Sequence, residues 1–444
     1  MPEARSVAHG LRRTVATAGW DLPLFAVATG LDQGGRLALN LAAAVVLGPA
    51  DFGAWVVITL LLQYAVFLAL GIPNGAGREI PRALGRGDPD AAAHTEDIAS
   101  GGILATGLLA SVAALVVAPI AVGQDAGLRA STLLLLALAV LLQQAFVLEQ
   151  VLFRSRLRFR PASVQLAVQG AAAPVVGITL LLAGWGLDGL LLARVAVLVV
   201  ALAMAGRTLA RLPRPRWDPV GLRALIAVGL PLLAAGILLV LLITVDRWIV
   251  LALLGREALG VYGLVGFAAS SLLLVPIMIS QQYYPRLAFA RGEGHDAATL
   301  LRMARGQGLL AAMLTGLAAL FVAAAAWFGI PIALPAYREA IGPILVVLVG
   351  MVAYSSGSAY GNLLNLWDRQ RYHLAIQAVV LVTAVALGVG LVLLGWGIMG
   401  PAVGTASAMV AYALLLHLVV GWIGTKGVPT DRPTPIGSDV PAAP

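Results

Sequence analysis

The side chains in this sequence best suited to chemistry are charged groups that interrupt long apolar runs. Asp32 and Arg36 stand four residues apart, so a helix places both on one face. They form either a self-neutralising pair that eases membrane insertion or part of a polar cavity. Asp246 and Arg247 are adjacent, which in a helix points them about 100° apart and excludes simple mutual neutralisation. Charges in apolar helices usually face a partner or a water-filled cavity, so these residues and the isolated Arg194 are candidates for a polar cavity lining, with Arg36 available to an anionic group. Contacts between helices are the alternative for Asp246, Arg247 and Arg194.

Uncharged polar residues extend this candidate site. Gln33 and Asn40 lie near the first charged pair, and Asn362 belongs to a polar stretch over 354–365. Polar stretches also hold membrane helices together. The stretch 354–365 is therefore open to two interpretations, helix packing and cavity lining. We interpret Glu149, near the end of its apolar run, as a residue that reaches the aqueous edge or pairs with a loop arginine.

No catalytic or metal-binding pattern accompanies these residues. The sequence has 5 His and 0 Cys, and the His residues do not cluster, so we expect no metal and no cofactor. Residues 184–189 read G-x-G-x-x-G, but a dinucleotide site needs this pattern between a strand and a helix. Here it separates two apolar runs, which predicts a tight turn. The sequence contains no hydrolase motif and no large extramembrane segment, so we do not expect an enzyme.

Composition indicates the surroundings of the candidate site. Hydrophobic residues make up 60% of the chain, charged residues 11%, and mean hydropathy is +0.93. Soluble domains carry about 25% charged residues, so this chain could not cover a water-exposed surface. We therefore predict an all-α integral membrane protein. The net charge of +8 does not indicate nucleic-acid binding, because the basic residues are confined to short loops between apolar runs.

Hydropathy predicts about twelve transmembrane helices. We place them at 20–47, 52–72, 97–122, 129–152, 162–184, 187–206, 223–254, 259–280, 303–328, 339–366, 372–395 and 398–422. The loops after every second span are rich in arginine and the alternate loops are nearly free of it. The positive-inside rule then places both termini in the cytoplasm, N-in and C-in. All 9 Trp residues lie near predicted span ends, as an aromatic belt requires.

An internal repeat divides the spans into two groups of six. Three short motifs recur in the same order, 47–53 as 254–260, 80–82 as 284–286, and 184–189 as 395–400. We therefore predict two parallel six-helix bundles, an arrangement typical of transporters that hold substrate between the halves. The predicted divisions are a cytoplasmic N-terminal segment (1–19), an N-terminal bundle (20–206), a basic cytoplasmic linker (207–222), a C-terminal bundle (223–424) and a disordered cytoplasmic tail (425–444).

The sequence resembles the polysaccharide transporter family, the Wzx-type O-antigen and exopolysaccharide flippases of the multidrug/oligosaccharidyl-lipid/polysaccharide flippase superfamily. The resemblance covers about residues 15–424 and rests on the segments 47–53, 71–86, 245–248, 254–263 and 281–286 and on the turns 184–186 and 395–397. It implies a MATE/MurJ-like fold. The low aromatic content, 6%, departs from the stacking residues that sugar sites usually use, so sugar recognition is left unexplained.

The resemblance further implies a flippase of the bacterial plasma (inner) membrane. Such a protein moves an undecaprenyl-diphosphate-linked oligosaccharide from the inner to the outer leaflet, for O-antigen, exopolysaccharide or capsule, by alternating access around a cationic cavity. We assign Arg36, Arg194 and Arg247 to the anionic part of the substrate, and we expect Asp32 and Asp246 to tune them or to carry coupling protons. The expected partners are the lipid-linked oligosaccharide, membrane lipids and a polysaccharide polymerase or assembly protein, and the expected state is a monomer.

Other functions stay open. A multidrug/toxin cation antiporter of the same superfamily should carry cavity acids without matching arginines, whereas arginines accompany the acids here. A lipid II flippase commonly has two further helices. A membrane glycosyltransferase or polysaccharide ligase generally needs a larger outer loop than the one around 329–338. A non-transporting assembly protein would leave the buried charges without a role.

Overall fold

A computed structural model describes residues 2–123, 128–208, 211–367 and 369–425 of the chain. Residues 426–444 of the predicted tail (425–444) and the side chains of the predicted segment 1–19 lie outside what it describes. The elements in chain order are α1 (Pro2–Ala65), η1 (Val66–Ala69), α2 (Ile72–Gly85), α3 (Pro89–Val122), α4 (Ala130–Ser155), α5 (Phe159–Leu182), α6 (Gly186–Thr208), α7 (Pro219–Gly292), α8 (Ala297–Ala324), η3 (Ala325–Gly329), α9 (Ile330–Ala333), η4 (Pro335–Ala340), α10 (Ile341–Leu366), α11 (Gln370–Leu393) and α12 (Met399–Thr425).

Aspartates define the start of three helices on the arginine-rich side. Asp88, Asp218 and Asp296 cap α3, α7 and α8, each accepting hydrogen bonds from backbone N–H groups of the first turn. A capping carboxylate satisfies donors that have no partner inside the helix. At α8 the hydrogen bonds from Thr299 hold the pKa of Asp296 below its usual value.

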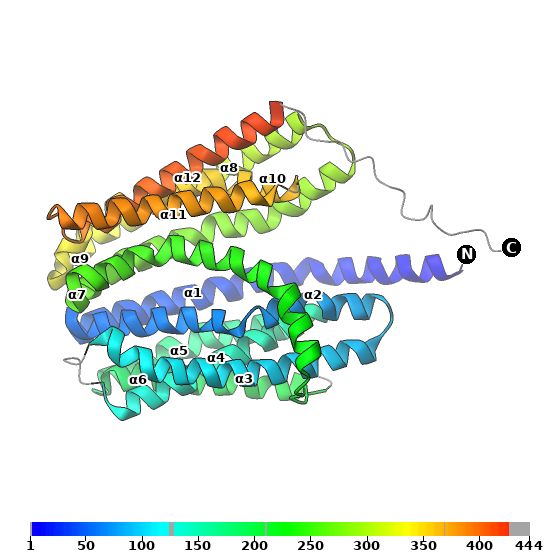
Figure 1. The fold of residues 1–444 in the computed structure, drawn as a ribbon, viewed down its shortest axis with the longest axis horizontal. Helices are drawn as coiled ribbons and strands as arrows, with labels where there is room; N and C mark the ends of the chain where they lie inside the picture. The colour runs from blue at the N-terminus through cyan, green and yellow to red at the C-terminus, as the bar shows by residue number, and fades with distance from the viewer. Residues whose placement is uncertain (1, 124–127, 209–210, 368, 426–444) are drawn as a thin grey trace.

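Ten of the helices that the structure describes are long and apolar enough to cross a membrane, by length and composition. The protein is therefore an all-helical membrane protein. The two longest of these segments, Val27–Ala69 and Gly236–Gly292, each contain one non-helical glycine, Gly48 or Gly255. The chain reverses direction within both α1 and α7 (Figure 1). Each of the two helices thus corresponds to two predicted spans, while twelve crossings and the N-in, C-in orientation stay predictions.

The helices form two groups that lie side by side (Figure 1). In the first group α1 packs on α5, and both α3 and α6 pack on α4. In the second group α10 packs on α8 and α12, and α11 packs on α12. We call these groups the N-terminal and C-terminal bundles. The residue boundaries predicted for them stay predictions.

The repeated Gly-Trp-Gly motifs adopt the same backbone conformation in both bundles. Gly184 and Gly186 have φ values of 85° and 52°, and their counterparts Gly395 and Gly397 have 87° and 52°. Residues other than glycine rarely adopt these positive φ values, so the motif needs glycine at both positions. The G-x-G-x-x-G segment is thus a tight turn leading from α5 into α6, as the sequence predicts.

Two glycines bring the bundles into backbone contact at one end of the molecule. A Cβ added to Gly53 would lie 2.1 Å from the carbonyl oxygen of Arg256, and one added to Gly260 would lie 1.9 Å from that of Pro49. No real Cβ could occupy either position. We call this contact, made by Pro49 and Gly53 of α1 with Arg256 and Gly260 of α7, the glycine seam.

Aromatic side chains continue the contact beside the glycine seam. The rings of Phe52 and Tyr337 pack edge to face with centroids 5.9 Å apart. Phe52 also lies against Phe267, with centroids 6.0 Å apart. The hydroxyl of Tyr337 donates a hydrogen bond to the carbonyl oxygen of Ala44 at 2.8 Å. Together with the seam, these contacts close the space between the bundles at this end.

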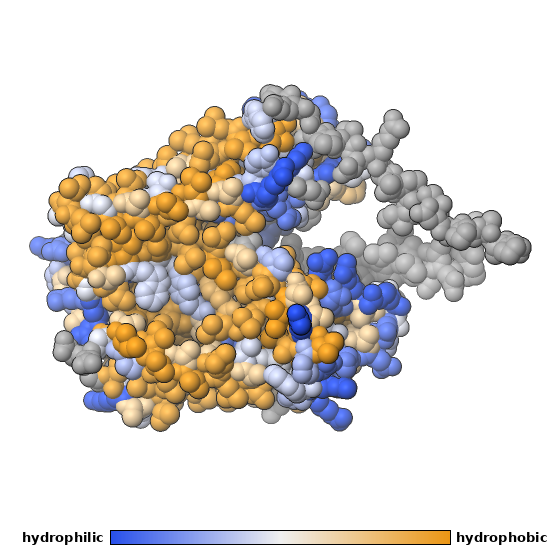
Figure 2. Space-filling model, viewed as in Figure 1, coloured by the Kyte–Doolittle hydropathy of each residue, from blue (hydrophilic) through white to orange (hydrophobic). Residues whose placement is uncertain are grey.

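The bundles separate toward the opposite end, where α1 begins and α12 ends (Figure 1). The space-filling view shows a hollow between them on that side (Figure 2). The first turns of α7 nevertheless stay on the N-terminal bundle. A Cβ added to Gly229 would lie 2.0 Å from the carbonyl oxygen of Gly71, and one added to Gly75 would lie 2.3 Å from that of Leu225. The start of α7 is therefore the physical link between the two bundles at the open end.

Candidate functional site

A small cavity in the N-terminal bundle brings together three of the predicted site residues. Its volume is about 40 Å³, and Asp32, Arg36 and Arg194 line it together with Trp55 and Gln169. These side chains come from both limbs of α1 and from α5 and α6. The remaining lining residues are apolar, so the polar groups lie together in a small space. We call it the donor cavity.

Asp32 and Arg36 form the ion pair that their spacing predicts. The Nε atom of Arg36 donates to Oδ2 of Asp32 at 2.9 Å. The Arg36 side chain is 45% exposed, whereas that of Asp32 is 8% exposed. The terminal guanidinium nitrogens of Arg36 make no hydrogen bond to any residue that the structure describes. The pair therefore neutralises Asp32 and still leaves N–H donors for another group.

Arg194 and Gln169 supply two further donors that have no acceptor. One terminal nitrogen of Arg194 donates to Oε1 of Gln143 at 2.8 Å. The Nε of Arg194 and the Nε2 of Gln169 are buried and, among the described residues, hydrogen-bond to nothing. An unsatisfied buried donor costs about 1–3 kcal/mol, so a protein rarely keeps two on one cavity unless something else satisfies them.

The balance of donors and acceptors indicates what this cavity can bind. Arg36, Arg194 and Gln169 offer N–H groups, while Oδ2 of the acceptor Asp32 is already bound by Arg36. Phosphate and carboxylate oxygens are the acceptors that guanidinium groups bind best. A volume of about 40 Å³ holds little more than a water molecule, so a phosphate group could enter only if α1 moved relative to α5 and α6.

Asp246 and Arg247 lie elsewhere, within the folded-back helix α7. Asp246 accepts from the hydroxyl of Tyr262 at 2.9 Å and from the backbone N–H of Arg247 at 2.8 Å. Arg247 donates to the carbonyl oxygen of Gly266 at 2.9 Å, and its Nε has no acceptor among the described residues. Both side chains therefore join the two limbs of α7 instead of lining the donor cavity. Their assignment to substrate and coupling stays a prediction.

The remaining predicted residues have different surroundings. Asn40 accepts a hydrogen bond from Nε1 of Trp55 at 2.8 Å, so it orients a side chain of the donor cavity without lining it. Gln33 is half-buried and is not part of that lining. Asn362 lies in α10 of the other bundle, where its Nδ2 is buried without an acceptor among the described residues.

Gln143, Gln169 and Trp55 are site residues that the sequence analysis missed. Each is uncharged, so a search for buried charges passes over it. A signal was present, because an amide inside a transmembrane helix must find a partner or a cavity. The sequence places Trp55 in the aromatic belt, but its side chain is 4% exposed and donates a hydrogen bond to Asn40.

The interpretation of Glu149 as an edge residue or a partner of a loop arginine is wrong. Its side chain is only 5% exposed, and its Oε1 accepts from Nε2 of Gln165 at 2.9 Å. Its Oε2 has no partner among the described residues. The loop arginine after α4 pairs with α3 instead, since Arg156 binds both oxygens of Glu96 at 2.7 and 2.9 Å. Glu149 therefore forms no ion pair with any described residue.

We expect Glu149→Gln to keep or raise the thermal unfolding midpoint in detergent. The amide oxygen can still accept from Gln165, while a buried charge without a cation is removed. Glu149→Ala should lower the midpoint, because it leaves a cavity and removes an acceptor. We expect the free energy of unfolding to fall by about 2–4 kcal/mol. Tryptophan fluorescence during heating measures both variants. An alanine variant more stable than the glutamine variant would contradict this account.

Comparison with known proteins agrees with this architecture. A family model described as polysaccharide biosynthesis protein matches residues 43–328. The inward-facing conformation of a multidrug resistance MATE family transporter of the MOP superfamily is similar in fold, with a TM-score of 0.64 and 16% identity over 91% of this chain and 95% of that one. An outward-facing conformation of such a transporter has a TM-score of 0.62 and 14% identity, over 91% of this chain and 96% of that one. No curated protein matches. Since the family model covers more than half of the sequence, the chain belongs to the polysaccharide biosynthesis protein family.

Proposed function

We propose that this protein is a flippase of the bacterial plasma membrane that carries an undecaprenyl-diphosphate-linked oligosaccharide from the inner to the outer leaflet. The product would serve the synthesis of O-antigen, exopolysaccharide or capsule. The protein acts as a monomer, handing its cargo to a polymerase or another assembly protein. Family membership supports the link to polysaccharide biosynthesis, and the fold is shared with transporters.

The donor cavity is the observation that carries this proposal. A diphosphate supplies acceptor oxygens and negative charge, and Arg194, Gln169 and the half-exposed Arg36 supply unsatisfied or available donors. The pairing of Asp32 with Arg36 fits an anionic cargo better than a cationic one. A cation exporter would need that carboxylate free, whereas Arg36 binds one of its two oxygens and balances its charge.

The arrangement of the bundles supports alternating access. They touch through the glycine seam at one end and separate at the other. In the proposed N-in, C-in orientation the open end faces the cytoplasm, where lipid-linked sugars are assembled. Movement that opened the seam and closed the other end would expose the side of α1 that lines the donor cavity to the outer leaflet. The start of α7, held on α2, would act as the connection about which the bundles rock.

The class of cargo can be tested with purified protein in liposomes. A fluorescent undecaprenyl-diphosphate oligosaccharide is placed in both leaflets, and a membrane-impermeant reductant bleaches the outer one. We expect bleaching to continue beyond the outer-leaflet fraction when the protein is present, because the protein returns protected lipid to the outside. The same sugar on a neutral polyprenyl ether should stay protected, because it offers no phosphate oxygens to the cavity.

The alternative of a cation antiporter has its own arm in this experiment. The same liposomes are loaded with a lipophilic cationic dye, and its release is followed under an imposed proton or sodium gradient. If the dye is released and the diphosphate lipid stays protected, the protein is an antiporter and the flippase proposal is wrong. Movement of the neutral ether at the rate of the diphosphate lipid would remove the donor cavity from substrate recognition.

A further inference from the structure

A second and larger cavity lies on the flank of the N-terminal bundle. Its volume is about 310 Å³, at the lower end of the range for ligand sites, and it shares no residue with the donor cavity. Helix α4 forms its floor and α3 and α6 its sides, since both pack on α4 but not extensively on each other. The segment 211–218, which leads into α7, covers one end. We call this space the flank groove.

The flank groove has the length and character of one lipid chain. On α4 its lining runs from Leu141 to Leu152 at helical spacing, which is about 16 Å. Half of a hydrocarbon core is about 15 Å thick. Every α4 position on this stripe is apolar except Glu149, which bonds to Gln165 of α5. Leu104 on the rim is 46% exposed, so the groove opens on the side that faces lipid.

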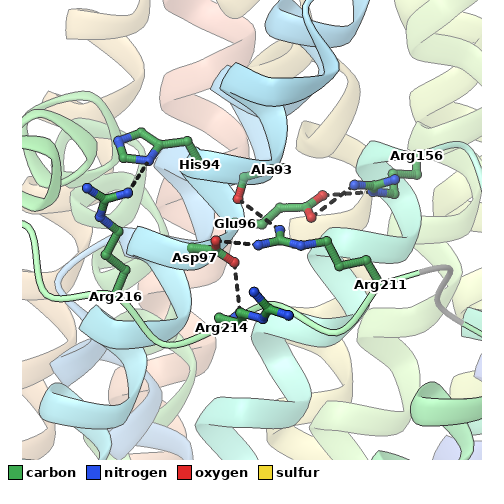
Figure 3. Close-up of polar contacts among 8 residues, drawn as sticks. All are labelled: Ala93, His94, Glu96, Asp97, Arg156, Arg211, Arg214 and Arg216. Carbon is green, nitrogen blue, oxygen red and sulfur yellow. Dashed lines mark hydrogen bonds and ion pairs between the residues drawn. The ribbon is translucent and has the colours of Figure 1, made fainter.

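The covering segment is tied firmly to α3 (Figure 3). Asp97 alone holds it at three points. Its Oδ1 accepts from the backbone N–H of Arg214 at 2.7 Å, its backbone oxygen accepts from the N–H of Arg216 at 3.0 Å, and its Oδ2 accepts from the guanidinium of Arg211. That last hydrogen bond raises the pKa of Arg211. A Cβ on Gly101 would lie 2.2 Å from the carbonyl oxygen of Arg216, so the segment also presses directly on α3.

The arginines at this end of the groove outnumber the carboxylates that bind them. Arg211 is matched by Asp97, and Arg156 by Glu96. Arg214 is exposed, and its guanidinium group bonds to no residue that the structure describes. Its neighbours on both sides, Pro213 and Pro215, line the groove. The segment that covers one end of the apolar groove therefore carries a guanidinium group that no carboxylate binds.

We propose that the flank groove binds one anionic glycerophospholipid of the inner leaflet, with an acyl chain along α4 and its phosphate at Arg214. The polarity of the groove matches that of such a lipid in the proposed orientation, with the cationic end at the cytoplasmic surface and the apolar end toward the midplane. Basic pockets between helices on this side of a membrane are known to take anionic headgroups. Bound there, the lipid would brace the segment that carries the chain into α7. This proposal is independent of the cargo that the protein moves.

Native mass spectrometry of the protein released from mixed phosphatidylcholine and phosphatidylglycerol nanodiscs tests this directly. We expect one phosphatidylglycerol to be retained in preference to phosphatidylcholine. Arg214→Gln, at an exposed position, should lower the retained phosphatidylglycerol about fivefold, because one basic residue near a membrane surface contributes about 1 kcal/mol. Ala145→Phe, which fills the groove, should abolish retention of both lipids.

Two matched variants control for general effects. Arg86→Gln removes an exposed arginine from another loop of the same side, and Leu138→Phe enlarges a lipid-facing position of α4 outside the groove. Both should retain phosphatidylglycerol as the parent does. Equal retention of the two lipids by the parent would overturn the proposal, as would parental retention by Arg214→Gln. Dimers that disappear in Ala145→Phe would show that a second copy of the chain covers the groove instead.

Discussion

Arg36→Glu should abolish transport of the diphosphate-linked oligosaccharide while the protein still folds and inserts. The substitution places a carboxylate one turn from Asp32, so the donor cavity gains repulsion toward phosphate and loses its half-exposed guanidinium. Juxtaposed like charges cost several kcal/mol, which predicts a fall in rate of about 100-fold or more. The side chain at this position is 45% exposed, so the new charge need not be buried. The liposome bleaching assay described above measures the rate.

A second ion pair in the chain provides the matched control. Arg82 binds Glu79 at 3.0 Å with its side chain 55% exposed, and the two residues are three apart on α2. Arg82→Glu therefore repeats the charge reversal in a similar helical pair away from the donor cavity. It should transport at close to the parental rate. If Arg36→Glu transported normally, or if Arg82→Glu failed equally, the donor cavity would lose its place as the phosphate site.

Arg194→Gln separates recognition of the anion from simple neutralisation of Asp32. It removes a charge that Asp32 does not bind, since the short contact of Asp32 is with Arg36. A loss of rate in this variant therefore reports on the cargo. Hydrogen bonds to charged groups contribute about 1.5–3 kcal/mol each, so we expect a loss of about tenfold to 100-fold. A parental transport rate in Arg194→Gln would leave Arg36 as the one arginine of the cavity that binds the cargo.

The membrane fold was predictable because its signals are local. Apolar runs long enough to cross a bilayer need only composition, and the Gly184 and Gly395 turns need only positive φ values that glycine tolerates. The residues at which helices begin and end were less predictable. α1 begins at Pro2, whereas the sequence predicts that the first helix begins at residue 20 after a polar segment. Hydropathy marks where a helix is apolar and not where its backbone hydrogen bonds begin or end.

The site was predictable only in part because it depends on which helices meet. The four-residue spacing of Asp32 and Arg36 is a property of one helix, and the pair formed as expected. The meeting of this pair with Arg194 requires α1 to pack beside α5 and α6, which the sequence does not state. The separation of Arg247 from them follows from the fold of α7 upon itself, which directs that side chain to Gly266.

Gly260→Ala should prevent the bundles from closing at the glycine seam and should stop transport. The added Cβ would lie 1.9 Å from the carbonyl oxygen of Pro49 and 3.0 Å from the backbone nitrogen of Gly53. Both are backbone atoms, so no side-chain rotation can relieve the clash, and the helices must move apart. Gly316→Ala is the matched control, because it makes the same change inside α8 where nothing lies within 4 Å. That control should transport normally and gain slightly in stability from the better helix former.

The separation of the bundles in Gly260→Ala can be measured directly. The chain has 0 Cys, so spin labels can be attached to cysteines placed at the exposed positions 51 and 257, one on each side of the seam. We expect the distance between the labels to increase in Gly260→Ala and to stay at its parental value in Gly316→Ala. Because alternating access requires this end to close and reopen, a variant held apart here cannot complete the cycle. A parental label distance together with parental transport in Gly260→Ala would show that the seam is packing alone and that the cycle does not depend on its closure.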